Sequence, residues 1–162
     1  MQYRAIHTSA GLALMAQAQA TGAQITLGEI AVGDGGGARA EPREDQTALV
    51  GERFRAAINR TYQLDPVGFP TKYASEIVIP ASVGGFVLRE IALYTGDGTL
   101  FVVGNLPETY KPTPEDGAFT DTLARIEYLV SNTDLLTLQS DPNAAVASQQ
   151  WVRDFVADQM DG

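Results

Sequence analysis

Apolar and polar side chains alternate through the middle of this 162-residue chain, in segments that are separated by turn residues. The clearest segments are 53–64 (RFRAAINRTYQL), 84–94 (GGFVLREIALY), 100–106 (LFVVGNL) and 120–131 (TDTLARIEYLVS). A period of two places successive side chains on opposite faces of a strand. Asp97-Gly98, between the second and third segments, is a strong signal for a two-residue hairpin turn. The pattern therefore predicts antiparallel strands in succession.

The two ends of the chain have helical patterns instead. Thr8 or Ser9 is suited to begin a helix that runs to about Ala20, and Gly22 is suited to end it. Residues 144–160 contain neither glycine nor proline and predict a second helix. The predicted fold class is α+β, with an N-terminal helix, a mainly antiparallel β domain within residues 1–143, and a C-terminal helix within residues 144–162.

The predicted C-terminal helix carries an apolar stripe, formed by Trp151, Val152, Phe155 and Val156. Such a stripe either packs back onto its own domain or meets copies of itself in a bundle. A helix that comes last in the sequence and carries a large aromatic side chain favours self-association. Both interpretations stay open on the residues alone.

The glycine run VGDGGG, residues 32–37, lacks the features of a phosphate-binding loop. A Walker loop needs a lysine followed by serine or threonine, but Ala38 and Arg39 follow the run. A dinucleotide-binding loop opens directly into a helix, whereas here a polar, proline-containing loop follows. The run is therefore interpreted as a turn that needs positive φ angles.

The remaining polar candidates do not assemble into a recognisable catalytic, cofactor or metal site. His7 is the single histidine, and the chain contains no cysteine, which excludes disulfides and thiolate metal sites. Asp34 and Asp97 adjoin glycines without the ligand spacing of a calcium-binding loop. Arg89 and Glu90 lie within an apolar strand, where burial would require each to be paired or hydrogen-bonded. We favour a structural ion pair between the two, or two side chains whose ends face solvent.

Charge and hydropathy exclude two classes of partner. The net charge of −9 argues against binding to nucleic acid or to an anionic membrane surface, because both need a basic face. No stretch approaches the roughly 20 apolar residues of a membrane span, and the N-terminus does not resemble a signal peptide. We therefore expect no membrane insertion and synthesis in a cytoplasm.

One long segment resembles a known family. Residues 78–112, VIPASVGGFVLREIALYTGDGTLFVVGNLPETYKP, resemble the N-terminal domain of phage tail-collar fibre proteins. The opening residues TSAGLALMAQA and the glycine loop AVGDGGG are similar to that family as well. The motif residues expected to have structural roles are Gly84, Gly85, Phe86, Arg89, Glu90, Tyr94, Gly104 and Asn105.

The resemblance implies a structural virion protein rather than an enzyme, with no cofactor. The chain would be the root of a tail fibre that is anchored to the phage baseplate and supports host attachment, with a separate distal fibre protein as a further partner. Fibres of this kind are homotrimers, so Trp151, Val152, Phe155 and Val156 would lie in a trimeric bundle. The residues expected to contact the baseplate protein are Leu12, Met15, Gly33, Asp34, Gly35 and Gly36.

Two other classes of protein share the location of a tail fibre. A depolymerase that acts on host surface glycans would need a pair of carboxylates in a cleft, and the sequence offers no clear pair. A carbohydrate-binding module would usually present several exposed aromatic side chains, but Trp151 is the sole tryptophan. These alternatives remain beside the structural interpretation.

Overall fold

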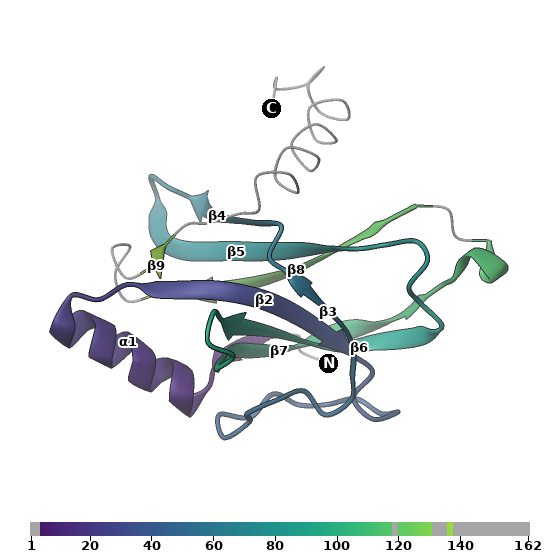
Figure 1. The fold of residues 1–162 in the computed structure, drawn as a ribbon, viewed down its shortest axis with the longest axis horizontal. Coiled ribbons are helices and arrows are strands. Elements are labelled where there is room, and N and C mark those ends of the chain that lie inside the picture. Colours follow the sequence, from purple (N-terminus) through teal and green to yellow (C-terminus); the bar gives the residue numbers. More distant parts are fainter. Residues whose placement is uncertain (1–3, 118–119, 131–135, 138–162) are drawn as a thin grey trace, which may run out of the picture.

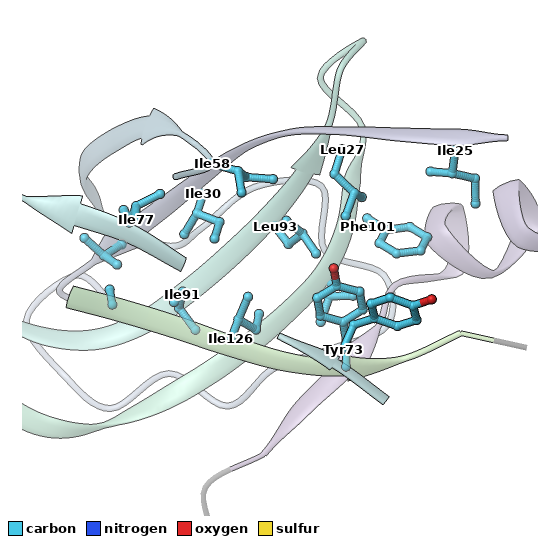
Figure 2. Close-up of a cluster of buried hydrophobic side chains, with 14 of the residues drawn as sticks. Ile25, Leu27, Ile30, Ile58, Tyr73, Ile77, Ile91, Leu93, Phe101 and Ile126 are labelled. Carbon is cyan, nitrogen blue, oxygen red and sulfur yellow. The ribbon is translucent and has the colours of Figure 1, made fainter. Parts of the chain in front are cut away.

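The computed structural model describes residues 4–117, 120–130 and 136–137 of the chain. These residues form two β-sheets that pack face to face, with one α-helix beside them (Figure 1). A single apolar core lies between the two sheets and receives side chains from both (Figure 2). The architecture is therefore a β-sandwich.

The larger sheet has the strand order β1-β7-β6-β2-β3, and all of these neighbours are antiparallel. A further short strand, β9 (Leu136–Thr137), pairs in parallel with the first residues of β2. The bounds are β1 (Ala5–His7), β2 (Ile25–Gly33), β3 (Glu52–Ala57), β6 (Phe86–Thr95) and β7 (Leu100–Lys111).

The smaller sheet has the order β4-β5-β8 and is antiparallel throughout. Its strands are β4 (Arg60–Asp65), β5 (Phe69–Ile79) and β8 (Thr122–Leu129). Ala124, Ile126 and Tyr128 on β8 are buried, as the alternation over 120–131 predicts, and Ile126 points into the core (Figure 2). The buried faces of the two sheets come from the same period of two that identifies the strands.

The segment 53–64 changes sheets half-way, which corrects the prediction of one continuous strand. The backbone N–H of Ile58 donates to Gly28 in the larger sheet, 3.1 Å away, and that of Asn59 donates to Glu76 in the smaller sheet, 2.8 Å away. The chain therefore turns a corner between β3 and β4 and joins the two sheets along one side. The alternation continues through this corner, so the sequence alone does not reveal it.

A bulge in β2 explains its imperfect alternation. The register with β6 shifts between Leu27 and Glu29, so one extra residue lies in this strand. As a result Leu27 and Ile30, three residues apart, both enter the core (Figure 2). The side-chain alternation of β2 therefore changes phase at the bulge.

The helix α1 (Ser9–Thr21) is confirmed with its predicted ends. The fully buried side chain of Thr8 caps it by accepting from the Gly11 N–H, and Gly22 ends it in a left-handed conformation with φ of 78°. Gly11 lies against β7, where a Cβ atom would come within 2.3 Å of the Phe101 carbonyl oxygen. This close contact holds the start of the helix on the sheet.

The predicted fold class, α+β with a C-terminal helix that forms a trimeric bundle, is wrong. The described chain is mainly antiparallel β, with one α-helix and the short 3₁₀ helix η1 (Pro114–Asp116). The core is built between two sheets, and α1 supplies to it only a few side chains, such as Met15 and Ala18. The segment predicted as the C-terminal helix, 144–162, lies outside the described residues, as do Trp151, Val152, Phe155 and Val156.

The polar segment that begins at residue 107 is partly a strand. The structure continues β7 through Lys111, and Lys111 itself is buried. Strand β1 was not predicted, because three residues are too few for alternation to be recognised.

The contact between Gly11 and β7 makes a prediction about stability. Gly11→Ala is expected to lower the free energy of unfolding by about 1–3 kcal/mol, because the new methyl group must displace the Phe101 backbone. Urea denaturation followed by circular dichroism measures this change.

Gly96→Ala is the matched control, since its Cβ would meet only Thr26 at 3.7 Å, an ordinary contact. Equal stability of the Gly11→Ala variant and the wild-type protein would contradict the close packing.

Candidate functional site

The glycine loop that follows β2 is a tightly closed turn. Gly35, Gly36 and Gly37 all have positive φ angles, between 68° and 97°. Non-glycine residues adopt this region only at a cost, which explains three glycines in succession. The Asp34 side chain stabilises the turn by accepting from the Gly36 N–H at 2.8 Å and from Arg53 Nε at 2.8 Å. These two hydrogen bonds, that from Gly36 first, hold the pKa of Asp34 below its usual value.

The buried carboxylate of Glu90 joins this loop to a second segment of the chain. Its two oxygens accept backbone N–H groups from Gly35 at 2.9 Å, Val50 at 2.9 Å and Gly51 at 2.7 Å. Glu90 lies on β6 and is only 1% exposed, so these charge-assisted bonds compensate for the loss of water. We call this arrangement of Glu90 with the three amides the carboxylate clamp.

The clamp requires glycine at the points where two segments of the backbone approach each other. A Cβ atom at Gly33 would come within 2.5 Å of the Glu90 carboxylate, and one at Gly51 would come within 2.3 Å of Asp34. The backbone segments around Gly33 and Gly51 therefore lie nearly in contact, with the Asp34 N–H donating to the Gly51 carbonyl at 2.9 Å.

The hydrogen bonds of the glycine loop argue against phosphate binding by its backbone amides. The amides of Gly35, Val50 and Gly51 already donate to Glu90, and that of Gly36 donates to Asp34. An incoming anion would have to displace carboxylates that belong to the fold. The interpretation of residues 32–37 as a structural turn agrees with these contacts.

Arg89, the neighbour of Glu90 on β6, also binds the glycine loop. A register shift between Leu88 and Glu90 places Arg89 at a bulge in β6. Its guanidinium donates to the Glu108 carboxylate at 2.6 Å and to the Asp34 carbonyl at 2.9 Å. Each of the two residues has its own partners, instead of the ion pair between them or the solvent-facing ends that the sequence led us to favour.

A second structural centre surrounds the buried ammonium of Lys111. This group donates to the carbonyl oxygens of Val83 at 2.7 Å, Pro112 at 3.2 Å and Pro80 at 3.3 Å. Gly84 packs against the same turn, where a Cβ would come within 2.3 Å of the Pro112 carbonyl. The motif residues Gly84 and Gly85, with Phe86 next to them, thus shape the corner that leads into β6. Sequence reasoning did not single out Lys111, because nothing local marks it as buried.

The other motif residues hold β1 and the outer face of the larger sheet. The side chain of Asn105 accepts from the Arg4 N–H at 2.7 Å. Because Gly104 has no Cβ atom, β1 can pack closely against it: a Cβ there would lie only about 3 Å from Arg4 and Ala5. Tyr94 is buried on the outer face, where the Arg55 guanidinium lies 4.0 Å from its ring centroid. Burial raises the pKa of Tyr94.

The residues expected to contact a baseplate protein fall into two separate groups. Leu12 on α1 is half-exposed, whereas Met15 is part of the core. Gly33, Asp34, Gly35 and Gly36 lie at the far end of β2 from the helix (Figure 1). The structure does not bring the two groups together, and their role in binding stays a prediction.

Neither of two grooves in the described part of the chain offers a pair of carboxylates. The larger, of about 490 Å³, lies between β1 and β8, where Glu127 is the one acidic side chain of its described lining. The smaller, of about 330 Å³, lies between α1 and the β6–β7 turn and has Asp97 alone. A glycosidase of the common two-carboxylate type needs two such groups in one cleft.

His7 closes one end of the larger groove. Its Nε2 donates to the Leu129 carbonyl oxygen at 2.5 Å, which bridges β1 and β8. Its Nδ1 is buried and has no hydrogen-bond partner among the described residues. Burial lowers the pKa of His7, partly opposed by the bond to Leu129. The imidazole is therefore held neutral in a structural position.

The family of this chain follows from its match to known proteins. The model of the N-terminal part of phage tail-collar fibre proteins matches residues 1–150. The chain belongs to this family. It is 36% identical over 159 residues to a probable tail fiber protein of Escherichia phage P2. That match covers 98% of this chain and 24% of the phage P2 protein, so the chain spans about a quarter of that relative's length. No solved structure matches the chain.

The family resemblance that the sequence motifs indicated is thus confirmed, and the chain is a phage tail fibre protein, a structural component of the virion. Most motif residues of this tail-collar fibre domain lie at the carboxylate clamp, at the corner around Lys111, or where β1 pairs with β7. Within the described part of the chain, no helix has the length and apolarity to cross a membrane.

The carboxylate clamp predicts that replacing one carboxylate oxygen of Glu90 by an amide nitrogen lowers the stability of the fold markedly. Glu90→Gln is expected to lower the free energy of unfolding by about 1.5–3 kcal/mol, because an amide group cannot accept all three N–H groups. Thermal and urea denaturation measure this change.

Glu108→Gln removes the same charge from a half-exposed ion pair with Arg89 and is expected to change stability by less than about 1 kcal/mol. Equal effects of the two substitutions would show that the clamp does not carry the stability.

His7 predicts a pH dependence of stability. Its pKa in the folded protein lies below the ordinary value of 6.5, so the unfolded chain binds the proton more readily. Stability should therefore fall as the pH is lowered from 7 through 6.5 and towards the pKa of the folded state.

His7→Gln keeps a donor for Leu129 but does not titrate. Its unfolding midpoint should change less than that of the wild-type protein between pH 7 and 5.5, because the variant lacks the titrating imidazole. Parallel curves for the variant and the wild-type protein would rule out His7 as the origin of the effect.

Proposed function

We propose that this tail-collar fibre domain is the root of a tail fibre and attaches the fibre to the phage baseplate. The observation that carries the proposal is the match of residues 1–150 to the N-terminal part of the family, together with a relative about four times as long. A fibre that reaches outward to a host must be held at one end, and the N-terminal domain is the end that this chain represents. Support of host attachment follows from this position.

The exposed loops held by the carboxylate clamp suit such an attachment surface. Val50 donates its backbone N–H to Glu90, while its side chain is 59% exposed. The exposed Gly36 lies beside it, with its missing Cβ position 3.3 Å from Val50 Cγ1. A partner that binds this apolar side chain meets a loop that is already ordered, which lowers the entropy cost of binding. Val50 thus joins Asp34, Gly35 and Gly36 in the proposed contact, whereas Gly33, which was also expected there, is buried.

The proposal includes assembly of the chain as a homotrimer, which the family resemblance implies. A trimeric root would present three copies of the clamp loops to the baseplate, and binding through several copies raises the overall affinity.

Binding to tails tests the attachment directly. Tails of the phage from which the chain comes, assembled without their fibre, should co-sediment with the purified chain. Val50→Glu is expected to weaken this binding at least tenfold, because it places a charge in the proposed apolar contact.

Val67→Glu is the matched control, since Val67 is 94% exposed between β4 and β5, away from the clamp. No co-sedimentation of the wild-type chain would count against the attachment role. Equal binding by both variants would place the contact elsewhere on the domain.

A further inference from the structure

The two sheets of the sandwich are joined along one side and open along the other. The corner between β3 and β4 joins them on one side. On the opposite side, within the described part of the chain, β1 pairs with β7 alone and β8 with β5 alone, and the larger groove, of about 490 Å³, separates these two end strands. A free strand edge presents backbone donors and acceptors that an extended peptide can bind.

The hydrogen bonds of the β5–β8 pair determine which backbone groups of β8 face the groove. The Val130 N–H donates to the Thr71 carbonyl at 3.0 Å, so the even-numbered residues of β8 bond to β5. In an antiparallel pair, alternate residues turn their N–H and C=O groups inward and outward. The outward groups therefore belong to the odd-numbered residues 123–129, of which the Leu129 carbonyl already accepts from His7.

Strand β1 turns its odd-numbered residues toward the groove in the same way. The Thr8 N–H donates to the Phe101 carbonyl at 3.1 Å, and the Asn105 N–H donates to the Arg4 carbonyl at 3.1 Å. The even-numbered residues of this segment therefore bond to β7, and the N–H and C=O groups of Ala5 face the groove. Both walls of the groove thus offer backbone groups to one extended segment between them.

The floor of the groove is apolar. Ile91, Val102 and Ile126, which belong to the core, line it, and the first and last of these are labelled in Figure 2. A strand placed over this floor turns every second side chain toward it and the others outward. The inward side chains of an occupant must therefore be apolar.

The charged side chains around the groove favour an acidic occupant. Three of them are cationic, namely Arg4, Lys72 and Arg125, whereas Glu127 is the one acidic side chain of the described lining. The Glu127 carboxylate is shared, because it lies 3.0 Å from Arg125 and 3.7 Å from Lys72. Positive charge is therefore left at the groove, on a chain whose net charge is −9. The side chain of Arg125 is 49% exposed and accessible to a carboxylate.

We propose that the groove binds an extended segment of a partner protein, which adds as a strand to the edge of β8. Its inward side chains are apolar, and an acidic side chain lies beside Arg125. The added strand closes the open side of the sandwich, with backbone hydrogen bonds supplying affinity and the side chains supplying specificity. The described lining includes no residue of the clamp loops, so this contact is independent of the proposed attachment to the baseplate.

A short peptide with this pattern tests the groove. The probe is TVEVT, acetylated and amidated, whose two valines can face the floor while its glutamate lies beside Arg125. In an NMR titration of the full chain, TVEVT should shift the amide signals of residues 123–127. It should bind about tenfold more tightly than TVKVT, in which lysine replaces the glutamate. The absence of shifts at residues 123–127 at millimolar TVEVT would overturn the proposal.

Charge reversal identifies the residue that recognises the acidic side chain. Arg125→Glu should reverse the preference, so that TVKVT binds more tightly than TVEVT, and slow amide exchange at Ile126 would show that the variant is folded. Arg43→Glu makes the same charge change at an exposed site in the β2–β3 loop and should keep the wild-type preference. An unchanged preference in Arg125→Glu would overturn the proposal.

Val50→Glu separates this proposal from the attachment to the baseplate. This variant is expected to lose binding to tails but to bind TVEVT as the wild-type protein does, because Val50 is not in the described lining of the groove. The two proposals can therefore fail independently. Loss of TVEVT binding in Val50→Glu would count against a separate site at β8.

Amide hydrogen exchange distinguishes an added strand from a contact of side chains alone. Saturation with TVEVT should slow exchange at Arg125 and Glu127, because their N–H groups face the groove. Exchange at Ile126, whose N–H faces β5, should remain slow throughout. Shifted signals without slower exchange at Arg125 and Glu127 would overturn the addition of a strand.

Exchange measured before any peptide is added shows whether the groove is free. Slow exchange at Arg125 and Glu127 that depends on the concentration of the chain would mean that a second copy occupies the edge. Slow exchange at every concentration would mean that the chain fills its own groove. Either result would overturn the proposal of a separate partner.

Discussion

The buried carboxylate of Glu90 is the interaction on which the arrangement of the loops depends. A charge that is 1% exposed must be compensated within the fold, and three backbone N–H groups from two distant segments do this. The same contact closes the long connection between β2 and β3 at both of its ends. Within that connection, Leu49 packs on the outer face of the larger sheet, against the cluster that contains Ala31, Ala92 and Tyr94. Without the clamp, these apolar residues would face water.

The family motif describes such contacts rather than a reaction centre. Its glycines allow backbones to approach, its Glu90 and Asn105 accept backbone N–H groups, and Lys111 within the motif donates to three carbonyls. All of these groups are used within the domain. This is consistent with a tail fibre domain whose task is mechanical, because polar groups with internal partners rigidify a fold. What remains for partners is the outer surface, above all the clamp loops.

The proposed attachment surface belongs to the larger sheet. Val50 and Gly36 lie on the loops that close over the outer face of that sheet.

The sequence by itself determined most of the strands, where α1 begins and ends, and which family the chain resembles. These features depend on neighbours in the chain: alternation over 120–131 and the caps Thr8 and Gly22. A turn also lies at Asp97-Gly98, but it spans residues 96–99 rather than the two residues predicted, because β6 ends at Thr95 and β7 begins at Leu100. The tertiary structure alone decided that β3 and β4 separate at Ile58-Asn59, that Glu90 binds Val50 and Gly51, and that the core lies between two sheets. Each of these depends on backbone groups that are far apart in the sequence, and a local pattern does not record which distant amide will meet a carboxylate.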